Sequence, residues 1–420
     1  MGRRTANALS AVVIVVFACL QVLAHHNWGL SNDSYRYARH SMQILGEPRD
    51  VAQRQATKAY CSVEADQREH LRHLRPGGMP SPDRRAAQTR SCLRDNANGL
   101  GPRNPRYERI FDTRPGYPLL AAPAIGLFGI TRGMWLTSLV ITAGTSLLVL
   151  VLLRQARASL FAALTGQVLF LCSRPAWWSM RPLAEGAITA GVLAALLGAW
   201  WLLQGRSRPG VVLLCAALGT TALVKYSTAL VLAGSLVAAA ACLCLIRRNT
   251  GDGTSRGRAA LLGGLSAAAA IGIIAAMKAL RLPGASETLQ EIFTHHFRTP
   301  PVDDPLSQLL RLNVSYWVQW ACDQAAEPLF VLLLGLGCWG LLRCSPVLGV
   351  LSLAAGMVGL ATAAAHPTVS QGDRLWLLMW MPALLGTPLA VDLLRSRLRE
   401  ADSVHPRQLD DAVKAHSASR

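Results

Sequence analysis

The sequence predicts an all-α integral membrane protein with about ten transmembrane helices and a large first extracytoplasmic loop. Of its 420 residues, 51% are hydrophobic and only 16% are charged, and the mean hydropathy is positive. Long apolar runs recur along the chain, and basic residues gather in every second connection between them. A soluble domain of this length carries more charge and shorter apolar runs. We therefore expect a single polytopic membrane domain over residues 1–400, followed by a cytoplasmic tail at 401–420.

Each predicted span is an apolar run close to the roughly 20 residues that a helix needs to cross a bilayer. Helices are expected because lipid offers the backbone no hydrogen-bond partners. The stretch 210–246 can also be one broken helix, and the first span can also be a cleaved signal peptide. A permanent anchor is favoured for the first span, because candidate functional residues follow it directly. The runs are 7–24, 133–153, 158–174, 183–203, 210–224, 227–246, 259–279, 327–343, 346–365 and 374–394.

The positions of the basic residues predict the orientation in the membrane. Short cytoplasmic loops carry an excess of Lys and Arg, so the basic connections belong inside the cell. Both termini are then cytoplasmic, and the protein is expected to be a multi-pass protein of the cell membrane. The net charge of +18 does not indicate nucleic-acid binding, because the basic residues lie between apolar blocks instead of forming one stripe. The basic connections carry Arg3, Arg4, Arg154, Arg157, Arg206, Arg208, Arg247, Arg248, Arg256, Arg258, Arg343, Arg395, Arg397 and Arg399.

Two large loops are expected on the outer side, at 25–132 and at 281–326. The first loop is predicted to contain a surface helix near 50–74, followed by a Pro/Gly-rich stretch at 76–82. Its many Arg residues do not contradict the topology, because long loops escape the charge rule. The apolar stretch 117–129 is too short to span easily, so we expect a helix that lies at the outer interface.

Cysteines in the outer loops are candidates for a disulfide bond. Cys61 and Cys92 lie in the first loop, and pairing is plausible if that loop faces an oxidising compartment. Cys322 is a third candidate on the same side, so the pairing stays open at this point. Most other cysteines lie in apolar runs, where they are expected to act as small hydrophobic residues.

Ionisable residues collect at the outer ends of the predicted spans and are nearly absent from span centres. Charged groups inside a bilayer are costly, and a transporter or proton pump would place them at mid-membrane beside broken helices. The distribution therefore favours a site at the outer membrane face. The polar segments that carry it are Asn32-Asp33-Ser34-Tyr35-Arg36-Tyr37-Ala38, Phe111-Asp112-Thr113-Arg114-Pro115-Gly116-Tyr117-Pro118, Arg181-Pro182-Leu183-Ala184-Glu185, Lys225-Tyr226 and Gln371-Gly372-Asp373-Arg374-Leu375-Trp376.

Together these segments resemble the GT-C superfamily of membrane glycosyltransferases, and the closest patterns are those of the lipid A aminoarabinose transferases and the protein O-mannosyltransferases of glycosyltransferase family 39. In that group an Asp-Glu-x-x-Tyr-type motif opens the first outer loop, and the stretch 33–38 is similar. A basic-Pro pair before an apolar stretch looks like Arg114-Pro115, and an acidic residue near the outer end of the third and fourth spans looks like Glu185. The resemblance covers about 5–250 in order and spacing, and it implies a GT-C-like fold.

The resemblance implies a reaction at the extracytoplasmic face. A hexose or pentose would move, with inversion, from a polyprenyl-phosphate donor to a protein, lipid or envelope-glycan acceptor. The implied partners are the polyprenyl-phosphate sugar, the lipid bilayer and an acceptor that the sequence does not identify. Two other functions remain open from the sequence: a transporter or flippase for a lipid-linked precursor, and a non-catalytic membrane protein.

The implied transfer needs a base and a site for a phosphate leaving group. A carboxylate near the reacting carbon can take the proton of the acceptor, and Asp33 is the candidate catalytic residue. Guanidinium groups suit bidentate contact with phosphate. We therefore expect Arg114 to bind the donor phosphate, with Arg374 and Lys225 as the next candidates.

Two further acidic residues and a group of tryptophans have more than one interpretation. Glu185 and Asp112 are candidates for holding the acceptor or a divalent metal, which is the only candidate cofactor. The outer tryptophans are expected to anchor the protein at the membrane interface, and the alternative is that one or two of them stack on a sugar. These tryptophans are Trp177, Trp178, Trp317, Trp320 and Trp376.

Overall fold

The computed structural model is built from helices and describes residues 3–24, 29–79, 81–248 and 253–418. No strand occurs in this part of the chain. Seven of its helices are long and apolar enough to cross a membrane, or eight if the bent pair α14 and α15 forms one span. The expectation of an all-α integral membrane protein is therefore supported, whereas the number of crossings stays a prediction. The last two residues of the expected tail, 419–420, lie outside the described residues.

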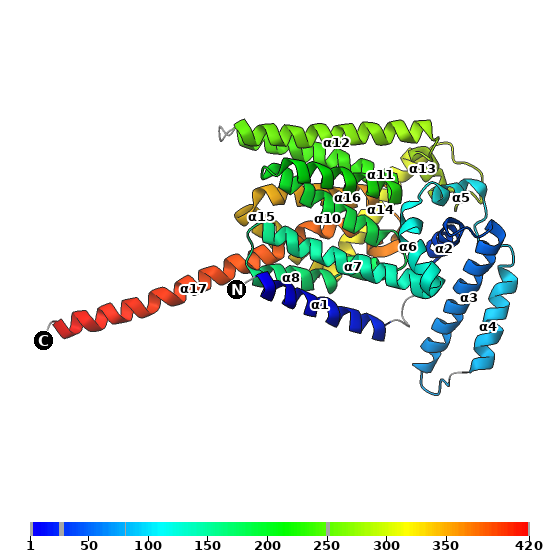
Figure 1. Ribbon diagram of the computed structural model, residues 1–420, viewed down its shortest axis with the longest axis horizontal. Helices are drawn as coiled ribbons and strands as arrows, with labels where there is room; N and C mark the ends of the chain where they lie inside the picture. The colour runs from blue at the N-terminus through cyan, green and yellow to red at the C-terminus, as the bar shows by residue number, and fades with distance from the viewer. Residues whose placement is uncertain (1–2, 25–28, 80, 249–252, 419–420) are drawn as a thin grey trace.

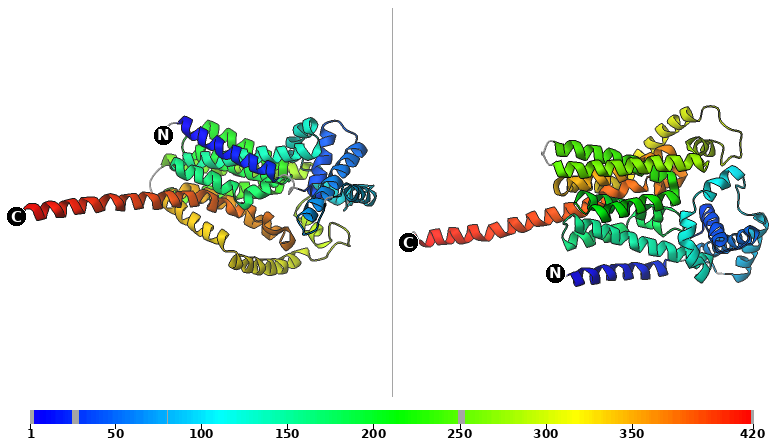
Figure 2. Two further views of the ribbon diagram at one scale, coloured as in Figure 1. Left: turned by 90° about the horizontal axis from the view of Figure 1, so that it is seen from below. Right: turned by 45° about the horizontal axis from the view of Figure 1, so that its top comes forward.

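Apolar helices form a bundle, and the two chain ends lie at the same end of it (Figures 1 and 2). The last helix, drawn in red, projects far beyond the bundle. The helices of the bundle are α1 (Arg3–Leu23), α7 (Ile130–Gln155), α8 (Leu160–Leu171), α10 (Glu185–Leu203), α11 (Ser207–Arg248), α12 (Gly253–Ala279), α15 (Leu329–Cys344), α16 (Pro346–Ala365) and α17 (Met381–Ala418).

A cap of further helices covers the opposite end of the bundle (Figure 1). It comes from the segments that the sequence predicts as outer loops. The expected surface helix at 50–74 is present as α3, and the apolar stretch at 117–129 is present as the short helix α6. The helices of these segments are α2 (Asn32–Ile44), α3 (Arg49–His73), α4 (Pro82–Asp95), α5 (Pro105–Asp112), α6 (Gly116–Phe128), α13 (Ala285–Phe293) and α14 (Pro305–Ala326).

Helix α11 consists of two arms that meet at Lys225. The backbone there is extended, with φ −160° and ψ 93°, which interrupts the helical hydrogen bonds. The first arm, 207–224, runs antiparallel to α10, because Gly198 packs on Leu214 while the earlier residue Gly191 packs on Thr221. Glycines at these contacts allow the two backbones to approach closely.

The second arm of α11, 226–248, runs antiparallel to α12. At one end the Tyr226 hydroxyl donates to the Pro283 carbonyl, just beyond α12, over 2.7 Å. At the other end the Cys244 thiol lies 3.8 Å from the Arg256 carbonyl, near the start of α12. The chain therefore reverses at Lys225. The stretch 210–246 is therefore one helix that is broken at Lys225, and its two arms run in opposite directions.

The last predicted span begins later than expected. The sequence predicts a helix from 374, but two short 3-10 segments, η2 (Val369–Arg374) and η3 (Leu377–Trp380), come first. Gly372 interrupts η2 with φ 56°, a left-handed conformation that glycine adopts at low cost. Helix α17 then starts at Met381 and continues without a break through the tail as far as Ala418.

A disulfide bond between Cys61 and Cys92 joins α3 to α4, with the two Cα atoms 5.6 Å apart. The two helices form a hairpin at the edge of the cap (Figure 1). Ser81 caps α4, since its hydroxyl accepts a hydrogen bond from the Arg84 backbone. Cys322, the third candidate, is a free and exposed thiol. The structure therefore selects the first of the open pairings.

Removing this disulfide should loosen the α3–α4 hairpin. The bond links residues that are 31 apart in sequence, and closing a loop of that size stabilises a fold by about 3–4 kcal/mol. We expect Cys61→Ala/Cys92→Ala to make the hairpin much more sensitive to limited proteolysis in detergent micelles. Cys19→Ala/Cys215→Ala is the control, because both of these cysteines are free and exposed. Equal cleavage rates in the two double variants would contradict the role of the bond.

Candidate functional site

One cavity of about 490 Å³ brings together most of the residues that the sequence analysis selects. Its lining includes the candidate base, all three candidate phosphate ligands and Glu185, and these five residues come from five separate segments of the chain. Side chains of the cap and of the bundle both contribute, so the cavity lies where the two parts meet. The selected residues in its lining are Asp33, Arg114, Glu185, Lys225 and Arg374.

Arg374 links two carboxylates in this cavity. Its Nε donates to Glu185 Oε1 over 2.5 Å, and its Nη2 donates to Asp33 Oδ2 over 2.7 Å. The Arg374 side chain is 21% exposed, and the two carboxylate side chains are 20% and 11% exposed. These contacts tie α2, the start of α10 and η2 together.

The Arg374 ion pairs shift the protonation equilibria of the groups at the cavity. Burial alone would raise the pKa of Asp33, but the charge and hydrogen bond of Arg374 outweigh it and hold that pKa below its ordinary value. Burial opposes the charge of Arg374 as well, yet Glu185 and Asp33 raise its pKa above the ordinary value. Asp33 is therefore a carboxylate at neutral pH.

Arg114 and Lys225 carry the remaining strong positive charge of the cavity. Neither forms an ion pair with a carboxylate among the residues that the structure describes. Arg114 Nε is buried and has no hydrogen-bond partner in the described part, and its guanidinium carbon lies 5.8 Å from the Tyr226 ring centroid. Both groups are thus placed to bind an anion.

A close approach of two backbones brings this pair together. Gly116 opens α6, two residues after Arg114, and it packs against the backbone of α11 beside Lys225. A Cβ atom at position 116 would lie 2.5 Å from the Val224 backbone nitrogen, so a larger residue cannot fit without a shift. The Arg-Pro-Gly sequence at 114–116 therefore positions the guanidinium next to the reversal of α11.

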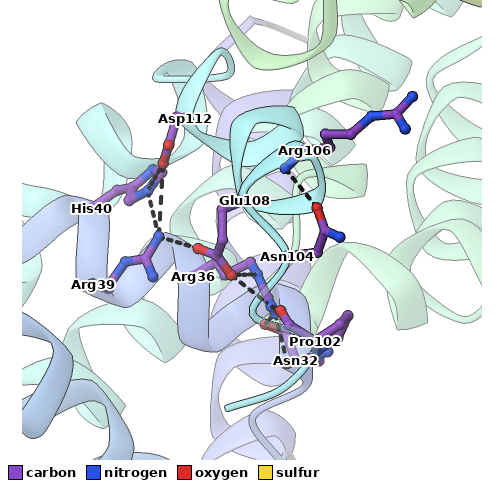
Figure 3. Close-up of polar contacts among 9 residues, drawn as sticks. All are labelled: Asn32, Arg36, Arg39, His40, Pro102, Asn104, Arg106, Glu108 and Asp112. Carbon is purple, nitrogen blue, oxygen red and sulfur yellow. Dashed lines mark hydrogen bonds and ion pairs between the residues drawn. The ribbon is translucent and has the colours of Figure 1, made fainter. Parts of the chain in front are cut away.

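Asp112 does not line this cavity. Its carboxylate accepts from His40 over 2.7 Å and lies 3.7 Å from Arg39, and its side chain is 47% exposed. Burial would raise the pKa of Asp112, but the His40 contact holds it below the ordinary value. The structure therefore separates Asp112 from Asp33 and Arg114, and gives it a contact at the edge of the cap (Figure 3).

Glu108 is a buried acidic residue that the sequence analysis did not select. Arg36 is fully buried and donates from its Nε to Glu108 Oε1 over 2.9 Å, while Arg39 donates to Glu108 Oε2 over 2.6 Å (Figure 3). Arg36 also donates to the Pro102 carbonyl and to the Asn32 side chain, each over 2.7 Å. One carboxylate therefore anchors two arginines of α2, one turn beyond Asp33. The i, i+3 spacing of the two arginines is a signal that could have indicated a shared acidic partner.

Two histidines also line the cavity. His296 Nδ1 contacts Glu291 Oε1, and the His296 ring lies 4.7 Å from the Tyr107 ring. Burial lowers the pKa of His366 to about 4, so this imidazole is neutral at pH 7. His366 Nε2 lies 3.5 Å from the Gln371 side-chain nitrogen. These side chains add neutral or paired polar groups to the cavity.

The cavity residues do not form a metal-binding cluster. Across the described ranges, no group of three or more His, Cys, Asp or Glu side chains is placed to hold a metal ion. The carboxylates of Asp33 and Glu185 both accept hydrogen bonds from Arg374. A divalent metal that used both carboxylates would have to displace this guanidinium.

Substituting Glu108 should destabilise the cap strongly. Glu108→Ala leaves Arg36 buried without its carboxylate, and breaking a buried ion pair in this way costs about 3–5 kcal/mol. Glu287→Ala is the matched control, because its pair with Arg106 is exposed and such pairs contribute about 0–1 kcal/mol. We expect a large fall in the unfolding midpoint in detergent for the first variant only. Similar midpoints for both would refute the structural role of Glu108.

Comparison with known proteins gives no further guide to this site. No family model, no curated protein and no solved structure matches the chain. What this site can bind is therefore indicated by the positions and the chemistry of the side chains that line the cavity.

Proposed function

We propose that this protein is a membrane glycosyltransferase of the GT-C type, which moves a sugar from a polyprenyl-phosphate donor to an acceptor at the extracytoplasmic face. One observation carries the proposal: a carboxylate that stays ionised lines a single cavity with two cations that have no carboxylate partner among the described residues. This cavity lies where the cap meets the bundle, far from the two chain ends. A lipid-linked anionic substrate would present its head group to such a site.

The proposed topology has ten crossings, both termini in the cytoplasm and the cap outside. Helices α1, α7, α8, α10, α12, α15, α16 and α17 supply one crossing each, and the two arms of α11 supply the others. The arginines of the short connections support this orientation, because Arg258 lies against Gly205 at the end of the bundle opposite to Lys225. The first outer loop, 25–132, then contributes Asp33 and Arg114 to the cavity.

In the proposed reaction, Arg114 and Lys225 bind the phosphate of the donor. Fixed cations stabilise the negative charge that develops on this leaving group. The acceptor hydroxyl or amine attacks the anomeric carbon and gives its proton to Asp33. The bond from the anomeric carbon to the phosphate oxygen breaks, and polyprenyl phosphate leaves with the electron pair. Arg374 is positioned to orient Asp33, since it already holds the Asp33 carboxylate.

Glu185 positions Arg374 in this scheme. Its Oε1 accepts from Arg374, while Glu185 Oε2 is buried and has no hydrogen-bond partner among the described residues. A second acceptor atom at the cavity can receive a hydrogen bond from a sugar or acceptor hydroxyl. Glu185 therefore both holds the arginine and offers a contact to a substrate.

Replacing Asp33 by Asn should abolish transfer without unfolding the protein. The amide keeps an oxygen for Arg374 but cannot accept the proton, and loss of a general base lowers the rate about 10²–10⁴-fold. In a strain that lacks the native protein, the variant should let one polyprenyl-phosphate sugar accumulate. Mass spectrometry of lipid-linked sugars and envelope glycans measures this directly, and the accumulating species identifies the donor.

The same substitution at Asp112 is the control, because Asp112 lies outside the cavity. Asp112→Asn should restore the normal lipid and glycan profile. If Asp33→Asn restores the profile as well, Asp33 is not the base. If the deletion strain accumulates no lipid-linked sugar and its glycans are unchanged, the transferase proposal fails.

Arg114→Gln should weaken the binding of the donor phosphate. A hydrogen bond to a charged group contributes about 1.5–3 kcal/mol, which corresponds to roughly a 10–100-fold rise in the donor KM. Arg109→Gln is the control, because Arg109 is exposed and donates to the Arg281 carbonyl away from the cavity. Product inhibition by polyprenyl phosphate should weaken in parallel for the Arg114 variant only. An unchanged KM and unchanged inhibition would remove Arg114 from the phosphate site.

A further inference from the structure

A second cavity, of about 690 Å³, lies on the other side of η2. Its walls come from the end of α8, the short helix α9 (Arg174–Met180), α14, α15 and the two 3-10 segments. Gly372 and Asp373 line this cavity, whereas their neighbours Gln371 and Arg374 line the first. The two cavities therefore share η2 as a wall, and none of the chemistry described so far uses the second.

Connected aromatic rings make up much of the second cavity. The Phe330 ring lies 4.8 Å from the Trp376 ring and 4.9 Å from the Trp380 ring. The Trp320 ring lies 6.0 Å from the Trp376 ring, at 90° to it. Ring faces carry partial negative charge and attract the polarised C–H groups of a sugar ring, so such walls suit a pyranose.

Three donors in this lining have no hydrogen-bond partner among the described residues. They are the Tyr316 hydroxyl and the indole nitrogens of Trp320 and Trp380. Tyr316 and Trp380 are only 4% and 5% exposed. Buried donors are nearly always satisfied in proteins, so their grouping in one cavity indicates a ligand with acceptor oxygens. Tryptophans that merely anchor a helix keep their N–H in the wet headgroup region instead.

Helix α14 forms the wall of the cavity that carries Tyr316 and Trp320. It is bent by 89° from α15, and Tyr316 is its only buried residue. Leu310, Val314 and Val318 form an exposed apolar stripe at intervals of four residues, a pattern that suits contact with lipid. Tyr316 and Trp320 therefore line the cavity from a helix whose other face is exposed and apolar.

The charged residues of the lining indicate which net charge a ligand of this cavity can carry. Three carboxylates line the cavity, those of Asp323, Glu327 and Asp373, against the single guanidinium of Arg174. Arg174 Nε lies 3.1 Å from Asp373 Oδ2 and so already neutralises one of them. The remaining negative charge repels an acidic ligand and favours a neutral or amine-bearing one.

We propose that the second cavity binds a saccharide that carries no acid group, with its ring on the aromatic walls and its hydroxyls on the Tyr316, Trp320 and Trp380 donors. The saccharide is the acceptor of the transfer reaction, and this role alone rests on the proposed function. Asp373 and Arg374 are adjacent in sequence and line different cavities, so an acceptor here lies beside the proposed donor site.

The test is direct binding to the full-length protein in nanodiscs, measured by saturation-transfer NMR. The probes are methyl glucoside, methyl galactoside and methyl mannoside, with the amino-sugar and uronic acid analogue of each. We expect binding of at least one neutral or amino sugar, and at least fivefold weaker binding of its uronic acid analogue. Trp320→Phe and Tyr316→Phe each keep an aromatic ring and remove one donor, which should weaken binding by about fivefold.

Trp201→Phe is the matched control, because Trp201 also has a buried indole nitrogen without a partner among the described residues but lies outside both cavities. It should bind as the native protein does. Failure of every neutral and amino sugar to bind, or unchanged binding in both cavity variants, would overturn this inference. Asp33→Asn should bind the saccharide normally while losing transfer, so failure of the proposed function alone leaves this binding intact.

Discussion

The site depends on one largely enclosed arginine that two carboxylates share. Arg374 is 341 residues from Asp33 and 189 residues from Glu185 in sequence, yet it donates to both. Removing a charge from water is costly, and a buried ion pair is tolerated only when its geometry and hydrogen bonds are good. The three side chains therefore stabilise one relative placement of α2, α10 and η2. The cavity and the placement of Asp33 in it both follow from this constraint.

A buried arginine within α2, Arg36, also holds this helix in place. Arg36 is fully buried against Glu108, and the Ser31 hydroxyl accepts from the Ser34 backbone to cap the start of α2. Asp33 lies between these anchors, so its carboxylate has little freedom to turn away from the cavity. A catalytic group that is held in position before substrate binds loses little entropy during the reaction. The buried Arg36–Glu108 pair thus helps to hold the helix that carries the proposed catalytic residue Asp33.

Local patterns were enough to predict most of the helices and the polar segments, but they were not enough to predict which side chains meet. Apolar runs are local and indicated α6 and the bundle helices, and the surface helix α3 was expected within the first outer loop, whereas α13 and α14 lie in a segment that was expected only as a loop. Glu108 could not be selected as the partner of Arg36 and Arg39 from the sequence, because only the fold decides which turn of α5 faces these arginines. The late start of α17 also could not be predicted from the sequence. The 3-10 segments before it form the wall between the two cavities, and this packing exists only in the folded protein. The Cys61–Cys92 pair was open until the hairpin geometry brought the two Cα atoms within 5.6 Å.

The shared wall links the two cavities physically. Arg374 is held from one side by its carboxylates, and Asp373 is held from the other by the Trp178 indole, which donates over 2.7 Å, and by Arg174. Gly372 precedes them with φ 56°, a conformation that lets the backbone turn between the two sides. Consecutive residues of η2 therefore face different cavities, since Asp373 lines the second and Arg374 lines the first. The two proposed binding sites are thus separated by a segment of only six residues, and side-chain contacts from both cavities set its placement.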